Sequence, residues 1–263
     1  MNNPSLLLLA LLSACAPLSA QVIQPQAAAA PPCVGEHVAG QFDSYTFTMS
    51  WEPAFCEGKP GATECANQRP DRFDAANLAL HGLWPDVVGD TAHCYGNCGV
   101  SAADQALDRA PTWCQLPEPA YSASTRVALT TVMPGIASCL DHHEWSKHGT
   151  CSGMTDDAYF ALAAGLVQQV AASPFGRFLK ANAGQTVDAS AAVDAFEAGF
   201  GAGSGAKLSL NCTNVRGAPA LLEVRLHLPK TLTPDAVLAT LLLPTGDKGS
   251  CPPRFLLDPI PSR

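Results

Sequence analysis

Three observations on this chain of 263 residues predict an α+β fold. Hydrophobic residues make up 47% of the chain and charged residues 14%, so a packed core can form. Patterns typical of strands occur mostly near the two ends of the chain, whereas helical patterns form one block between them. Because the two kinds of element are segregated, an α+β arrangement is favoured over a regular alternation of strand and helix. Eleven cysteines indicate a disulfide-stabilised domain rather than a reduced cytosolic enzyme.

Two segments show a clear strand pattern. In residues 45–51, four large hydrophobic residues alternate with Thr and Ser, and this period of two predicts a half-buried strand. In residues 222–228, Leu and Val alternate with Glu, Arg and His in the same way. Residues 207–211 and 254–257 predict two weaker strands.

The central block predicts three helices. Thr155 followed by two aspartates is typical of a helix N-terminus, because the acidic side chains suit the positive end of the helix dipole. That helix is expected to run to about residue 172. Ser173 and Pro174 predict the start of a second helix, which Gly184 is expected to end. Hydrophobic residues at helical spacing in residues 193–200 predict the third.

The N-terminal residues predict secretion. Residues 6–12 form an apolar run followed by small residues, as in a signal peptide over residues 1–20. Two forms of processing remain open. Cys15 ends a lipoprotein box and would carry a lipid anchor, whereas cleavage after Ala20 would release a soluble chain. No 18 consecutive residues are apolar, so no transmembrane segment is expected. The expected location is periplasmic or secreted, with the outer membrane as the location of the lipidated form.

The residues that follow predict a tether and one domain. Residues 21–32 are of low complexity and predict a flexible tether, which leaves a single domain over residues 33–263. Without Cys15, ten cysteines remain, an even number that allows up to five disulfides in an oxidising compartment. A zinc protein with cysteine ligands is the alternative. Its paired C-x-x-C sequences are absent, and only Cys94 and Cys98 come near that spacing.

The net charge of −8 limits the classes of function. It argues against a protein that binds nucleic acid through a broad basic surface. It permits an enzyme that meets a phosphate at one cationic spot and then releases its product.

Two segments carry residues suited to catalysis. HGLWPD begins at His81, and HEWSKHGTC begins at His143. If the second segment is helical, at about 100° per residue, His143 and Lys147 lie about 40° apart. Glu144 and His148 follow at about 100° and about 140° from His143. Two imidazoles, an ammonium and a carboxylate therefore share one broad face.

The histidine spacing argues against a metal. A helical zinc protease needs H-E-x-x-H, in which the histidines are four residues and about 40° apart. Here His143 and His148 are five residues and about 140° apart, which disfavours chelation of one ion from a regular helix. We therefore expect neither a metal site nor a cofactor.

This set of side chains suits the attack of a ribose 2′-hydroxyl on the adjacent phosphodiester. The hydroxyl needs a general base and the leaving 5′-oxygen a general acid, and histidine suits both roles. A nearby cation stabilises the negative charge that gathers on the phosphoryl oxygens. Because acid and base approach from opposite sides, a histidine from another segment is required, and His81 is the candidate. DNA lacks the 2′-hydroxyl nucleophile, so RNA is the expected substrate.

HGLWPD and HEWSKHGTC, in this order, resemble the two active-site segments of the ribonuclease T2 family. Residues 47–56, 132–135 and 157–160 resemble its bacterial periplasmic branch, the ribonuclease I-like members. The resemblance implies an α+β fold with a central antiparallel sheet and flanking helices. It also implies metal-independent cleavage of single-stranded RNA, through 2′,3′-cyclic phosphates to 3′-phosphates, with little base preference. We expect a monomer that needs no cofactor.

The resemblance assigns roles to individual residues. His81 matches the histidine of the first segment and is assigned as general acid, and His148 matches the catalytic histidine of the second and is assigned as general base. Glu144 and Lys147 match the pair that stabilises the transition state and tunes the histidines. His143 matches a phosphate-contacting histidine.

Further matches concern substrate binding and disulfides. Trp84 and Asp86 match residues of the family's principal base site, where an aromatic plane stacks on a base. The resemblance also implies the disulfides Cys56–Cys65 and Cys212–Cys251. One departure is Leu-Asp-His at residues 140–142, where many members have an aromatic residue.

Two other classes of function remain. A binding module without catalysis is disfavoured because His81, Glu144, Lys147 and His148 are all present. A secreted metal-dependent phosphodiesterase is disfavoured by the histidine spacing.

Overall fold

The computed structural model describes residues 37–90, 94–110 and 112–260, all within the unit Cys33–Arg263. The predicted signal peptide, Cys15 and the predicted tether over residues 21–32 lie outside the described residues. None of the helices in the described ranges has the length and hydropathy needed to cross a membrane.

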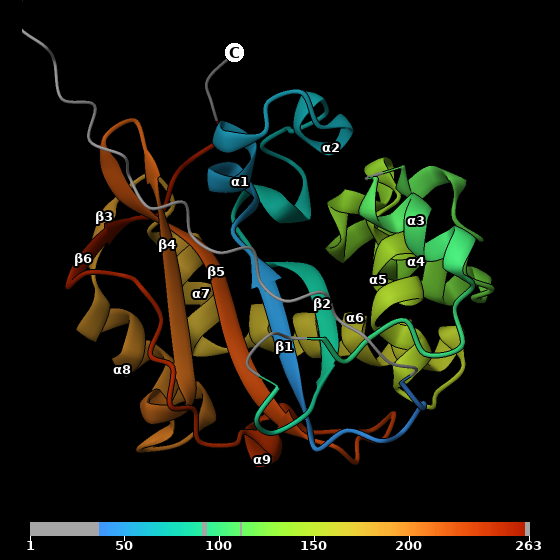
Figure 1. Ribbon diagram of the computed structural model, residues 1–263. Coiled ribbons are helices and arrows are strands. Elements are labelled where there is room, and N and C mark those ends of the chain that lie inside the picture. Colours follow the sequence, from blue (N-terminus) through green and yellow to red (C-terminus); the bar gives the residue numbers. More distant parts are fainter. Residues whose placement is uncertain (1–36, 91–93, 111, 261–263) are drawn as a thin grey trace, which may run out of the picture. The chain divides into compact units, whose positions relative to one another are not determined.

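Strands and helices alternate irregularly along the described residues (Figure 1). The strands are β1 (Ser44–Ser50), β2 (Ala79–Asp86), β3 (Thr186–Asp188), β4 (Leu208–Val215), β5 (Ala218–Pro229) and β6 (Arg254–Leu256). The helices are α1 (Glu52–Gly58), α2 (Thr63–Ala66), α3 (Ala102–Arg109), α4 (Ala123–Val132), α5 (Leu140–Lys147), α6 (Asp156–Ala172), α7 (Pro174–Ala181), α8 (Ala189–Phe200) and α9 (Leu238–Leu241). Five 3₁₀ turns, η1 to η5, cover Phe73–Ala75, Trp113–Gln115, Pro134–Ser138, Gly149–Cys151 and Ser204–Lys207.

One mixed sheet joins the six described strands. Its order is β2-β1-β5-β6-β3, and β4 also pairs with β5. Every pairing is antiparallel except that of β5 with β6, which is parallel at Ala220 and Leu256. The α+β fold with a central antiparallel sheet is therefore confirmed, and the single parallel bridge lies between β5 and β6. In Figure 1, α6 and α7 lie behind the sheet and α3, α4 and α5 lie beside β2.

The strand predicted over residues 45–51 is more deeply buried than its alternation suggests. Tyr45, Phe47 and Met49 are fully buried in the core, as predicted. The intervening Thr48 is also 0% exposed. β1 is flanked by β2 and β5, and its residues are buried on both faces of the sheet. The alternation on this central strand therefore separates a polar face from an apolar face without exposing either.

The strand predicted over residues 222–228 lies within β5, with one change of face. Val224, Leu226 and Leu228 are fully buried and the residues between them lie on the other face, as predicted. The register with β4 shifts opposite Asn211 and Cys212, so Leu221 rather than Leu222 continues the buried row. The weaker predictions at 207–211 and 254–257 correspond to β4 and β6.

The predicted helices are α6, α7 and α8. Thr155 caps α6 by accepting a hydrogen bond from the Ala158 backbone N–H, and α6 ends at Ala172. Ser173 caps α7 in the same way, but α7 ends at Ala181 rather than at Gly184. Gly184 instead adopts φ +86° in the turn that leads into β3, a conformation that glycine tolerates.

Disulfides join distant segments of the described chain, and two of them end next to α5. Cys56–Cys65 and Cys212–Cys251 are both present, as the resemblance implied. The other two described bridges are Cys98–Cys151 and Cys114–Cys139. Cys94 is disulfide-bonded as well.

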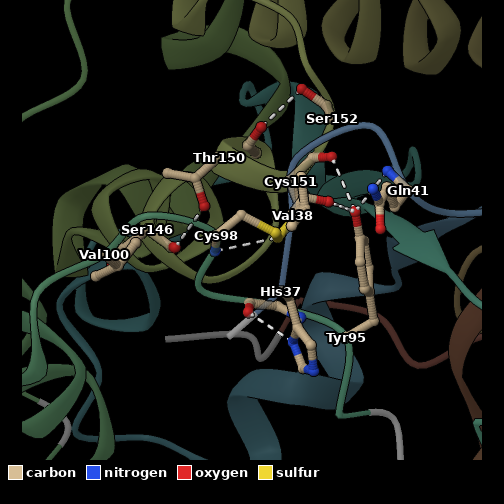
Figure 2. Close-up of a disulfide and its surroundings, with 12 residues drawn as sticks. His37, Val38, Gln41, Tyr95, Cys98, Val100, Ser146, Thr150, Cys151 and Ser152 are labelled. Atoms are coloured by element: carbon tan, nitrogen blue, oxygen red, sulfur yellow. Dashed lines mark hydrogen bonds between the residues drawn. A yellow bond between two sulfur atoms is a disulfide. The ribbon is translucent and has the colours of Figure 1, made fainter. Parts of the chain in front are cut away.

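Figure 2 shows how the bridge Cys98–Cys151 is embedded. The Tyr95 hydroxyl donates to the Val38 carbonyl at 2.7 Å and accepts from the Gln41 backbone N–H at 3.1 Å. The Cys98 backbone N–H lies 3.2 Å from the sulfur of Cys151. These contacts fix the chain on both sides of the bridge, immediately beyond the C-terminal end of α5.

Candidate active site

A β-bulge in β2 places His81 and Trp84 on the same face of the sheet. Opposite Thr48 and Met49, the partners on β2 are Gly82 and Leu80, so His81 is the extra residue. Without the bulge, residues three apart on a strand would point to opposite faces. With it, Leu80 and Leu83 both enter the core, and the imidazole and the indole meet on the polar face at 5.1 Å between ring centroids.

Gly82 allows α5 to approach β2 closely. A Cβ atom at this position would lie well within 3.0 Å of both Glu144 Oε2 and Trp84 Nε1. These two atoms are themselves hydrogen-bonded, with the indole N–H donating to the carboxylate at 2.7 Å. The glycine of HGLW therefore provides the space in which the two segments are joined.

The second segment is helical only as far as Lys147. His148 follows α5 with φ −116° and ψ −51°, and its backbone N–H donates to the Glu144 carbonyl. The angle of about 140° between His143 and His148 assumed a regular helix through both residues. Because the chain leaves that geometry at His148, the two rings are only 6.2 Å apart. The expectation that helical spacing separates these imidazoles is therefore wrong.

Glu144 lies at the centre of the cluster. Its side chain is 1% exposed, and Oε1 lies 3.8 Å from Nε2 of both His81 and His143. Among the described residues, Oε1 has no hydrogen-bond partner. Burial raises the pKa of this carboxyl above its ordinary value, against the lowering effects of the two imidazoles, Trp84 and Lys147.

His81 is surrounded by carboxylates. Its Nδ1–H donates to Glu223 Oε1 at 2.8 Å, and Glu144 faces its Nε2. Burial alone would lower the pKa of His81. The hydrogen bond to Glu223 and the charges of Glu144, Glu223 and Glu52 outweigh burial, so the pKa is raised above the ordinary value.

His148 has the opposite surroundings. Burial, followed by the positive charges of Lys147, His143 and His81, holds its pKa well below the ordinary value. Within the described residues its Nδ1 has no hydrogen-bond partner. The ring stacks on Trp84, with centroids 5.3 Å apart and planes 28° apart. This imidazole is therefore neutral near pH 7 and can accept a proton.

His143 is held by two residues that the sequence analysis missed. Its Nδ1–H donates to Asp108 of α3, and its ring stacks on Trp113 at 4.5 Å. Both partners come from a segment without a recognisable motif, so no local pattern pointed to them. Asp108 leaves Nε2 of His143 directed toward Glu144.

Lys147 lies at the end of α5, where its backbone is anchored. Its carbonyl accepts from the Asn97 backbone N–H at 2.8 Å, and Gly96 packs against the same carbonyl. Its ammonium makes no ion pair or hydrogen bond with any described residue, but its charge acts on both Glu144 and His148. It is available for an anionic ligand.

Asp86 lies at the end of β2, two residues beyond Trp84 on the same strand. Thr46 of β1 donates a hydrogen bond to its carboxylate. Asp86 therefore belongs to the polar face of the sheet, next to the cluster rather than within it. The structure brings His81, Trp84, His143, Glu144, Lys147 and His148 together.

Among the described residues, two groups of side chains have the spacing of metal ligands. One comprises Glu52 with Cys56 and Cys65, but these cysteines form a disulfide and offer no thiolate. The other comprises His143, Glu144 and His148, whose potential ligand atoms lie within 4.8 Å of one another. The second group follows from the position of His148 beyond the end of α5.

Solved structures share this fold. Ribonuclease MC1 from the seeds of bitter gourd superimposes with a TM-score of 0.54 and 21% sequence identity, covering 82% of this chain and all of that chain. The chain thus shares its fold with this ribonuclease.

Sequence comparison identifies the family. The model of the ribonuclease T2 family matches residues 42–236, and the chain belongs to this family. It is 30% identical to ribonuclease I of Escherichia coli K12, over 83% of this chain and 87% of that protein. It is also 30% identical to extracellular ribonuclease LE of Solanum lycopersicum, over 51% of this chain and 54% of that protein. The protein is therefore a T2-type endoribonuclease, and RNA is its substrate.

Replacing Gly82 tests the close approach of the two segments. We expect Gly82→Ala to lower ribonuclease activity about 100-fold. The new methyl group would overlap Glu144 and Trp84 and displace them, and a misplacement of about 1 Å can cost about 100-fold in rate. Gly61→Ala is the matched control, since a Cβ there meets nothing within 4 Å. Activity should be measured on RNA at equal folded concentrations. Equal activities of the two variants would contradict the role assigned to Gly82.

Proposed function

We propose that this enzyme cleaves single-stranded RNA without a metal, by transphosphorylation through a 2′,3′-cyclic phosphate to a 3′-phosphate. The observation that carries the proposal is the opposite electrostatic environment of two imidazoles that both lie against Trp84. His81 is surrounded by carboxylates and is protonated more readily, whereas His148 is surrounded by positive charge and remains neutral. An acid and a base with separated pKa values are what this reaction requires.

The first step uses both histidines. Neutral His148 takes the proton of the 2′-hydroxyl, whose oxygen attacks phosphorus. The bond from phosphorus to the 5′-oxygen breaks, and protonated His81 gives its proton to that leaving oxygen. In the second step, water replaces the 5′-oxygen and the two histidines exchange roles, which opens the cyclic phosphate to a 3′-phosphate.

The charge that develops on the phosphoryl oxygens is stabilised by Lys147 and His143. The ammonium of Lys147 makes no ion pair with the residues described here, so it can turn toward the substrate. Nε2 of His143 faces the same space, 3.8 Å from Glu144 Oε1. Glu144 counters the positive charge of these groups in the absence of substrate and holds Trp84 in place.

Base binding belongs to the polar face of β2. Trp84 and Asp86 are proposed to contact the base, and stacking on an aromatic ring discriminates little among bases. Trp84 also stacks on His148 and bonds Glu144, so its replacement affects catalysis as well as binding. No cofactor and no protein partner is needed for this chemistry, and we propose that the enzyme acts as a monomer.

A product analysis tests the mechanism. A short RNA and its 2′-deoxy counterpart are incubated with the enzyme in excess EDTA, and the products are identified by mass. We expect cyclic phosphate from the RNA alone, because only RNA carries the nucleophile. His148→Ala should lower the rate by about 10²–10⁴-fold. His142→Ala is the matched control, since this neighbouring histidine bonds the Leu116 carbonyl outside the cluster.

Two outcomes would contradict the proposal. Cleavage of the deoxy substrate would exclude the 2′-hydroxyl as nucleophile. Loss of all cleavage in EDTA, restored by a divalent ion, would indicate that His143, Glu144 and His148 hold a metal.

The surroundings of the histidines also predict the pH dependence of kcat/KM. Activity should rise as His148 loses its proton, at a pH well below its ordinary pKa of 6.5. It should fall only as His81 loses its proton, at a pH above the same ordinary value. The expected profile of kcat/KM therefore has a plateau that includes pH 6.5. It should be measured with an RNA dinucleotide at constant ionic strength. A descending limb below pH 6.5 would contradict the raised pKa of His81.

We further propose that the chain is secreted or periplasmic. The disulfides of the described residues support this proposal, because such bonds persist in oxidising compartments. The intact mass of the protein purified from a bacterial host should correspond to a chain that begins at Gln21. A chain that begins at an acylated Cys15 would instead indicate a lipoprotein anchored to the outer membrane. A chain that retains residues 1–20 would contradict secretion.

A further inference from the structure

We propose that Glu223, a residue outside both motifs, is a positioning residue for His81: its carboxylate holds Nδ1–H, so that Nε2 faces the leaving 5′-oxygen. This inference rests on the proposed function, because it concerns the residue assigned there as the general acid. The observation that carries it is the 2.8 Å hydrogen bond from His81 Nδ1 to Glu223 Oε1.

The contact spans two strands of the sheet. His81 projects from the bulge in β2 and Glu223 from β5, with β1 between them. Neighbouring strands lie about 4.8 Å apart, so the two side chains bridge about 10 Å over β1. Ser50 of β1 pairs with Glu223, and Thr48 lies two residues away on the same polar face. Their small side chains leave room for the bridge.

Glu223 is itself held in one orientation. Arg225, two residues farther along β5 on the same face, donates from Nε at 3.2 Å and from Nη2 at 2.7 Å to Glu223 Oε2. Oε1 is thereby left for His81. The Arg225 guanidinium also lies 6.0 Å from the ring centroid of Trp84, which bonds Glu144. Glu223 is therefore linked to the cluster directly through His81 and indirectly through Arg225, which lies near Trp84.

The charges in this chain of contacts keep Glu223 ionised. Burial would raise the pKa of its carboxyl, since only 11% of the side chain is exposed. The hydrogen bonds and charges of His81 and Arg225 outweigh burial and lower the pKa. An ionised acceptor at Nδ1 holds the ring more strongly than a neutral one, as charge-assisted hydrogen bonds are the stronger kind.

Glu223 differs from the other acidic groups that face His81. Glu144 lies 3.8 Å from Nε2, and Glu52 acts only through its charge, so neither holds the ring by a hydrogen bond. His148 faces His81 as a further titratable group, and its own pKa is lowered by the charge of His81. Glu223 is thus the described residue that determines which imidazole nitrogen is presented to the substrate.

The test compares two substrates for Glu223→Gln. One is an RNA dinucleotide, whose alkoxide leaving group needs a proton. The other is a nucleoside 3′-(p-nitrophenyl phosphate), whose aryl leaving group departs without one. We expect kcat on the dinucleotide to fall about 100-fold, within the contribution of a general acid, with KM nearly unchanged. The aryl substrate should lose much less, because attack by the 2′-hydroxyl does not involve His81.

The pH profile provides a second measurement. Removing the negative charge lowers the pKa of His81, so the descending limb should move to lower pH in Glu223→Gln. Glu223→Asp retains the charge and should restore that limb. Asp188→Asn is the matched control, since Asp188 is an exposed carboxylate paired with Arg254 on the same sheet. Its profile should equal that of the wild type.

The outcomes are distinguishable. Equal loss on both substrates, or an unchanged descending limb, would overturn the role of Glu223. Failure of the wild type to form cyclic phosphate would instead overturn the proposed function itself. If Glu223→Gln does not fold, Arg225→Gln takes its place. Arg225→Gln removes the two charge-assisted hydrogen bonds that orient the Glu223 carboxylate. Its activity should fall more on the dinucleotide than on the aryl substrate, and an equal loss on both substrates would again overturn the proposal.

Discussion

The active site depends on one buried carboxylate, that of Glu144, placed among groups that carry or acquire positive charge. Burial opposes ionisation of this carboxyl, and a buried charge is tolerated only beside compensating partners. Two imidazoles and one indole N–H provide the compensation. The bulge in β2 turns His81 toward the carboxylate, and the missing side chain at Gly82 lets the indole of Trp84 reach it. The helix α5 carries His143 and Glu144 together. Much of the local geometry therefore follows from surrounding a single charge.

The same charges separate the two proposed catalytic histidines. A histidine in water has no preference between the roles of acid and base near neutral pH. Glu144 and Glu223 face His81, and their negative charges favour its protonated form. His148 is buried beside cationic groups, which disfavour its protonation. Two identical side chains within one cluster thus hold different protonation states at one pH. In the proposed mechanism the substrate phosphate meets the cationic groups of this cluster, which is compatible with a chain whose net charge is −8.

The sequence was sufficient to predict the motif residues because their information is local. HGLWPD and HEWSKHGTC each place several functional groups within a few residues, and the structure brings nearly all of them together. The contacts of Glu223 with His81 and of Asp108 with His143 could not be predicted in this way. These two acidic residues lie 142 and 35 residues from the histidines that they bind, and a single acidic residue on a strand or helix has no pattern that reveals its partner. The helical angle failed at His148 because a periodic rule says nothing about where a helix ends.

The cysteine content and the active site are connected by the segment that holds His143. α3, which carries Asp108, has no buried residue, and neither has the 3₁₀ turn that carries Trp113. Hydrophobic burial therefore contributes little to their position. Two disulfides link the two ends of this segment to the chain on either side of α5: Cys98–Cys151 and Cys114–Cys139. A covalent link restricts the unfolded chain and limits the separation of the segments in the folded state. Where the core cannot position the groups that orient α5, disulfides do so, and the geometry of this half of the candidate site depends on an oxidising compartment.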